Sequence, residues 1–169
     1  MTSTSLLTDA FERVRKAVYD AAINLTPDQL AFRPYPEGNS IAWLIWHLSR
    51  IQDDHVAGVA QTKQVWESGD WAPRFGLEPG VMDTGYGHTP TQVATITVKS
   101  AEVLTAYYDA VHERTTRYVK TLIDDDLSRI VDTYWDPPVT LRVRLVSVIN
   151  DDLQHAGQAA YLRGMIEAS

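Results

Sequence analysis

Three side chains in two stretches of this sequence could together bind a divalent metal ion. His47 lies within the strongly apolar stretch 39–55 (NSIAWLIWHLSRIQDDH), and Asp151 and His155 lie in the stretch 150–158 (NDDLQHAGQ). At 3.6 residues per helical turn, His47 shares a face with the apolar residues around it and should point into the protein. A buried imidazole without a partner costs roughly 1–3 kcal/mol. We therefore expect the two stretches to meet and to hold an ion.

The spacing on the last predicted helix favours Asp151 over Asp152 as the partner of His155. With His155 set to zero and a step of about 100° per residue, Asp151 falls at about −40° and Asp152 at about +60°. A carboxylate and an imidazole at positions i and i+4, with a third ligand from a facing helix, can form a metal site inside a bundle. Asp152 would be the ligand instead if the helix were rotated slightly.

Two imidazoles and one carboxylate suit Zn, Ni, Fe or Mn. Three protein ligands also leave positions open for water or substrate, as catalytic rather than structural sites do. Spacing alone, however, favours a purely structural interpretation. An Asp-x-x-x-His pair on a helix is more often an ordinary ion pair, and a single buried histidine is more often a core residue with satisfied hydrogen bonds. His55, His88 and His112 have no comparable spacing, and we assign them no role.

Apolar residues at i, i+3 and i+4 spacing predict four long amphipathic helices that would position these side chains. We expect helices over 6–25, 39–60, 90–122 and 140–167. Ser5 could cap the first helix, Thr26 begins a short-helix signature, and 130–135 indicates either a short hairpin or an extended connector. The sequence thus predicts an all-α fold, a four-helix bundle in a single domain over 1–169, with at least one crossover connection.

The segment 61–88 loses the helical period and collects several glycine and proline residues. We expect a long irregular connection between the second and third helices that lies over one end of the bundle. Its aromatic residues Trp66, Trp71, Phe75 and Tyr86 would tie it to the core.

Composition excludes several classes of function. The chain has 169 residues, a formal net charge of −7 and no cluster of basic residues, so we expect neither nucleic acid nor a membrane surface as a partner. No run of about 18 apolar residues and no export signal is present, so we expect a cytoplasmic protein. With no cysteine, the chain offers neither thiolate ligands nor a cysteine nucleophile.

The stretches NSIAWLIWHLSRIQDD and NDDLQHAGQAAYLRG, together with TPDQLAFRP before the second helix, resemble the DinB/YfiT-like superfamily over nearly the whole chain. This superfamily of four-helix-bundle metalloenzymes includes mycothiol-dependent maleylpyruvate isomerase and bacillithiol transferases. The resemblance implies a metal site made by a histidine of the second helix and an H-x-x-x-H pair of the last helix. The matching positions are His47, Asp151 and His155, and Asp151 replaces the commoner histidine.

The resemblance extends to Gly157, Gln158 and Arg163, and helical phase alone adds Asp54. Gly157 would permit close helix packing, and Gln158 would orient a ligand. Arg163 would attract an anionic thiol or stabilise the C-terminal end of its helix. Asp54, two turns after His47, would accept a hydrogen bond from a ligand or remain an exposed charge.

By this resemblance the protein is a divalent-metal-dependent enzyme, with Zn or Ni favoured. It would be an S-transferase or isomerase that uses a low-molecular-weight thiol such as mycothiol on a small-molecule substrate. Two alternatives are a hydrolase that uses metal-activated water at the same site and a non-catalytic, stress-related binding or scaffold protein. A homodimer is compatible with the resemblance, but no sequence stripe marks an interface.

Overall fold

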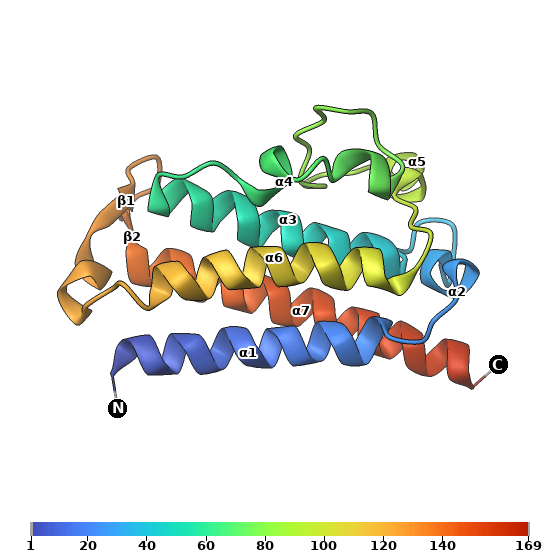
Figure 1. Ribbon diagram of the computed structural model, residues 1–169, viewed down its shortest axis with the longest axis horizontal. Helices are drawn as coiled ribbons and strands as arrows, with labels where there is room; N and C mark the ends of the chain where they lie inside the picture. The colour runs from blue at the N-terminus through green and yellow to red at the C-terminus, as the bar shows by residue number, and fades with distance from the viewer. Residues whose placement is uncertain (1, 169) are drawn as a thin grey trace.

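Four long helices form the framework of the structure, a computed structural model that describes residues 2–168. They are α1 (Ser3–Ala22), α3 (Ile41–Ala60), α6 (Ala101–Val119) and α7 (Leu141–Glu167). Helices α1 and α3 lie at opposite corners of the bundle, and each packs against both α6 and α7 (Figure 1). This arrangement confirms the predicted all-α four-helix bundle.

The directions of the helices explain why the chain needs a long connection. Helices α1 and α7 run one way, and α3 and α6 run the other way (Figure 1). The short helix α2 (Pro27–Ala31) lies where the chain reverses between α1 and α3. Because α3 and α6 are parallel, the chain must return along the length of α3, about 30 Å for a helix of this size, before α6 can begin.

Side-chain caps fix where the helices begin. Thr26 and Ser40 accept hydrogen bonds from the backbone N–H three residues later, as expected for N-caps of α2 and α3. Helix α1 begins three residues before its predicted start, because Thr2 is its N-cap. Ser5 lies inside the first turn, where its hydroxyl accepts from the Thr2 N–H and completes a capping box.

The prediction of one continuous helix over 90–122 is wrong. The chain forms a short helix α5 (Pro90–Thr95) and leaves the helical conformation at Ile96, which has φ −78° and ψ 103°. Four consecutive β-branched residues lie at this break, where their restricted side-chain rotamers weaken helix propensity. The Thr97 N–H instead donates to the Phe75 carbonyl, so the break is bonded to the preceding connection.

The connection 61–88 is mostly irregular, as predicted, but it lies along the side of α3 and not over one end of the bundle (Figure 1). It contains a single-turn helix α4 (Val65–Ser68) and a 3-10 turn η1 (Ala72–Phe75). The carboxylate of Asp53 accepts hydrogen bonds from the first two backbone N–H groups of α4, at 2.8 Å each. The middle of α3 therefore fastens the start of the connection.

Four consecutive carbonyl groups of the connection accept hydrogen bonds from side chains. Trp66 Nε1 donates to Val81, Arg50 donates to Met82 and Asp83, and His47 Nδ1 donates to Thr84, at distances from 2.5 to 3.2 Å. The Arg50 guanidinium is completely buried, lies 4.7 Å above the Trp66 ring and is 3.5 Å from Asp53. Such a buried charge is tolerated because its donors are satisfied.

A small hairpin lies between α6 and α7, at the end of the bundle opposite α2 (Figure 1). After the 3-10 turn η2 (Asp124–Ser128), strand β1 (Ile130–Asp132) pairs antiparallel with β2 (Val139–Thr140). Of the two sequence interpretations of this segment, the hairpin is correct. Within residues 2–168, no helix is long and apolar enough to cross a membrane.

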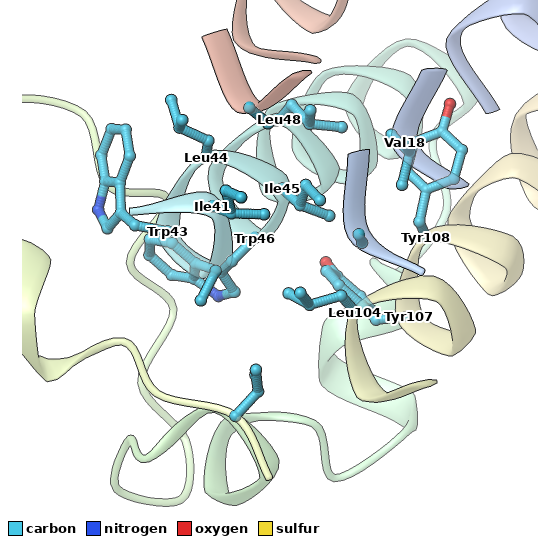
Figure 2. Close-up of a cluster of buried hydrophobic side chains, with 14 of the residues drawn as sticks. Val18, Ile41, Trp43, Leu44, Ile45, Trp46, Leu48, Leu104, Tyr107 and Tyr108 are labelled. Atoms are coloured by element: carbon cyan, nitrogen blue, oxygen red, sulfur yellow. The ribbon is translucent and has the colours of Figure 1, made fainter. Parts of the chain in front are cut away.

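Helix α3 buries side chains on nearly all sides in its first three turns. Figure 2 shows Ile45 and Leu48 directed toward Val18 of α1 and Tyr108 of α6, whereas Trp43 lies on the opposite side of α3. The first side forms the core of the bundle, and the second side leads to the candidate site.

The buried guanidinium makes a prediction about stability. Arg50→Leu leaves two connection carbonyls and the Asp53 carboxylate without their cation, and breaking a buried charged pair typically costs about 3–5 kcal/mol. We expect the free energy of unfolding to fall by about this amount in denaturant titrations, and the connection 61–88 to become sensitive to protease. Arg13→Ala, which removes an exposed pair with Asp9, is the control and should leave both properties unchanged. A variant as stable and as protease-resistant as wild type would show that Arg50 does not anchor the connection.

Candidate metal centre

The structure brings His47 of α3 together with Asp151 and His155 of α7. Each offers one ligand atom, and the three atoms lie within 4.8 Å of one another. The two imidazole rings are 4.7 Å apart at their centroids, with an angle of 69° between their planes. Asp152 is not part of this group, and its side chain is completely buried.

Hydrogen bonds fix the tautomer of both histidines. His47 Nδ1 donates to the Thr84 carbonyl at 2.5 Å, and His155 Nδ1 donates to the Asp151 carbonyl at 2.8 Å, since a carbonyl oxygen can only accept. Each ring therefore keeps the Nε2 lone pair available, as in metal sites where the second ring nitrogen is held by a hydrogen bond.

The carboxylate of Asp151 completes a donor set that fits a divalent cation. Its Oδ2 atom is buried and has no hydrogen-bond partner within residues 2–168, although it lies 3.3 Å from His155 Nδ1. A buried carboxylate oxygen without a donor is costly. An ion between Asp151, His47 and His155 would satisfy this oxygen together with the two free imidazole nitrogens.

The pKa shifts of His47 and Asp151 favour their ligand forms at neutral pH, whereas the shift of His155 favours its protonated form. Burial lowers the pKa of His47, which keeps its imidazole neutral. Burial raises the pKa of Asp151, but the adjacent His155 imidazole outweighs this effect, so the net shift is downward and the carboxylate stays ionised. Burial lowers the pKa of His155, but the hydrogen bonds and charge of Asp151 outweigh it and raise the pKa. A proton on His155 would thus compete with a metal ion as the pH falls.

The two candidate ligands of α7 are more exposed to solvent than His47. The side chain of His47 is only 5% exposed, whereas those of His155 and Asp151 are 18% and 33% exposed. The solvent-facing side of the centre is therefore the α7 side, from which a substrate could approach.

A network that the sequence did not indicate holds His47 in place. The Trp43 ring stacks on the His47 imidazole, with centroids 4.6 Å apart and planes 10° apart. Trp43 Nε1 donates to His88 Nδ1 at 3.1 Å, and His88 Nε2 donates to Asp83 at 2.6 Å. His88 and Asp83 lie in the irregular connection, where no periodicity could place them beside α3, so sequence analysis gave His88 no role.

Four other residues that the sequence analysis considered, Asp54, Gly157, Gln158 and Arg163, lie outside the donor set. Asp54 accepts a hydrogen bond from Gln64 and, within the described residues, makes none to His47 or His155. Arg163 donates to Glu167 and to carbonyls at the end of α1. Gly157 is exposed, and an added Cβ there would meet no atom within 4 Å, so close packing does not explain it. Gln158 is exposed on α7, one turn after His155.

Comparison with known proteins assigns the chain to a family. A family model described as mycothiol-S-transferase matches residues 6–168. The chain belongs to the mycothiol-S-transferase family. This match confirms the DinB/YfiT-like resemblance. A crystal structure described as a conserved protein from Enterococcus faecalis is 30% identical, with a TM-score of 0.91 over 100% of this chain and 99% of that chain. A search of curated proteins found no match.

The close approach of Gly85 to the centre makes a second prediction. Gly85 has φ +88°, and a Cβ there would lie 2.8 Å from the Trp46 ring and 2.9 Å from His47 Nδ1. Gly85→Ala should therefore displace the Thr84 carbonyl from His47 and release its tautomer, which nitrogen-15 NMR of the imidazole would detect.

Gly87→Ala is the matched control. Gly87 has φ +72°, so alanine there meets similar backbone strain, but its Cβ would have open space. Loss of the fixed His47 tautomer in both variants would attribute the effect to backbone strain and contradict the steric explanation.

The buried carboxyl of Asp152 makes a prediction about pH. Burial, with the nearby Asp151, raises its pKa well above the ordinary value, and neither oxygen has a hydrogen-bond partner within residues 2–168. The folded state then binds the proton more tightly than the unfolded state, so wild-type stability falls as the pH rises from the unfolded pKa toward the folded pKa. Asp152→Asn lacks this loss. In metal-free protein, we expect the melting temperature of Asp152→Asn relative to that of wild type to increase as the pH rises. A melting-temperature difference that does not change with pH would contradict the prediction.

Proposed function

We propose that this protein is a divalent-metal-dependent S-transferase that joins the sulfur of mycothiol to an electrophilic carbon of a small molecule. The observation that carries the proposal is the convergence of His47, Asp151 and His155, with the Nε2 lone pairs of both histidines free and the two α7 side chains partly exposed. The mycothiol-S-transferase family match supports the thiol as the second reactant.

The composition of the chain requires an external nucleophile. The chain has no cysteine, so the attacking sulfur must come from a substrate. A divalent ion held by the three residues, with Zn or Ni favoured, would lower the pKa of the substrate thiol and supply thiolate at neutral pH. In the reaction, a sulfur–carbon bond forms, the bond to the leaving group breaks with its electron pair, and the thiol proton passes to solvent.

The residues of the chain would act mainly by holding positions. Thr84 and Trp43 fix the plane of the His47 ring from its edge and its face, so that Nε2 has a defined direction. The negative charge of Asp151 would offset part of the charge of a cation in a half-buried site. The open α7 side would admit the thiol and the electrophile.

Metal analysis and kinetics test this proposal together. Protein purified without metal-affinity capture should contain a divalent ion by elemental analysis. It should catalyse conjugation of mycothiol to members of an electrophile panel, and stripping the ion should abolish the reaction. His47→Ala, Asp151→Ala and His155→Ala should each lower metal affinity by at least about tenfold and lose activity, with the helical circular dichroism unchanged.

His55→Ala is the matched control, because His55 also lies on α3 but outside the donor set, with its Nδ1 3.3 Å from Arg144. It should retain both metal and activity. Hydrolysis that proceeds without thiol would favour the metal-activated water alternative. Wild-type protein that never retains a divalent ion would favour the non-catalytic binding alternative.

A further inference from the structure

A groove lies beside the candidate centre, between α7 and the segment that connects α2 to α3. Its volume is about 770 Å³. Six of its lining residues carry polar groups that a ligand could contact: Tyr35, Glu37, Asn39, Gln154, Gln158 and Tyr161. Within residues 2–168, none of these six side chains makes a hydrogen bond, so their amide, carboxylate and phenol groups are available to a ligand.

The groove begins within about one helical turn of the candidate metal ligands. Gln158 lies one turn after His155 and two turns after Asp151, and Leu44 at the groove wall lies one turn before His47. From Gln154 to the last lining residue of α7, the groove extends for about 16 Å at the usual helical rise. A ligand lying along it would therefore place one end near the candidate centre.

The groove offers hydrogen bonds and aromatic faces but no positive charge. Among the described residues 2–168, no lysine, arginine or histidine lines it. The two nearest arginines in sequence already have acceptors. Arg33 donates to the Gly38 and Pro36 carbonyls of the adjoining turn, and Arg163 donates to Glu167 and to carbonyls at the end of α1. Carboxylate or phosphate groups of a ligand would find no cation here and would face Glu37.

The same lining suits a neutral ligand that is rich in hydroxyl groups. The side chains of Asn39, Gln154 and Gln158 can both donate to and accept from hydroxyls, and Glu37 can accept from them. Tyr35 and Tyr161 are 60% and 71% exposed and offer flat surfaces to the C–H faces of a sugar or cyclitol ring.

We propose that this groove binds the uncharged, polyhydroxylated part of the thiol substrate and thereby selects it against anionic thiols. The assignment of the bound molecule as a thiol rests on the proposed function, but recognition of the polyol does not require the metal. Mycothiol carries its cysteine on an uncharged glucosaminyl-inositol unit, whereas glutathione and bacillithiol carry carboxylates.

The test separates binding in the groove from catalysis. Metal-free protein would be titrated by calorimetry with an analogue of mycothiol in which alanine replaces cysteine, so that the analogue has no sulfur. We expect binding that Tyr161→Ala and Gln158→Leu each weaken by about five- to tenfold, the loss typical of one stacking or hydrogen-bonding contact. Tyr134 is another exposed tyrosine, in the hairpin connection outside the groove, and Tyr134→Ala should bind the analogue as wild type does.

The outcomes distinguish this inference from the proposed function. If the analogue binds and the groove variants weaken it, the groove assignment stands even where no transferase activity is found. In an active enzyme, the same variants should raise KM for mycothiol with little change in kcat. An analogue that does not bind, or binds equally to all variants, overturns the assignment. Groove variants that change the sedimentation coefficient without affecting binding would instead identify this face of α7 as a contact between two copies of the chain.

Discussion

The position of the candidate centre depends on one buried cation. Arg50 lies on α3 among side chains that are otherwise mostly apolar, where a guanidinium without partners would cost several kcal/mol. Besides Asp53, Gln64 and Tyr107, its partners include the carbonyls of Met82 and Asp83, in a segment with no regular secondary structure. The cation therefore holds this segment against α3, and the next carbonyl, that of Thr84, reaches His47. The orientation of the candidate ligand His47 thus depends on the Arg50 guanidinium, one helical turn away, although Arg50 makes no hydrogen bond to His47 itself.

Most of the helical framework could be predicted from the sequence, because the signals for helix formation lie within each segment. Apolar periodicity and the capping residues Thr26 and Ser40 located the helices to within a few residues. The error at 90–122 has a physical origin: the apolar period continues across the β-branched break, and the tertiary bond from Thr97 to Phe75 is not visible in the pattern. Helical phase also distinguished Asp151 from Asp152. The two side chains point about 100° apart around the α7 axis, which places Asp151 in the donor set and Asp152 in the core.

The surroundings of the centre could not be predicted in the same way. His88 and Gly85 reach it through an irregular connection, whose path is set by bonds to α3 that have no sequence period. The groove likewise combines α7 with a turn more than a hundred residues earlier. Helical position could suggest that Gln158 lies near His155, but it could not show that Tyr35 lies across from it.

The four carbonyls of residues 81–84 have a consequence for how this family can vary. Every amino acid supplies the same carbonyl, so the bonds from Trp66, Arg50 and His47 depend on where the backbone runs and hardly at all on which side chains it carries. Homologues can therefore exchange Val81, Met82 and Thr84 while preserving these bonds, whereas Asp83 also accepts a hydrogen bond from His88 through its carboxylate. Insertion or deletion of a single residue would shift all four acceptors out of register at once. In an alignment, this segment should combine high sequence diversity with an invariant length.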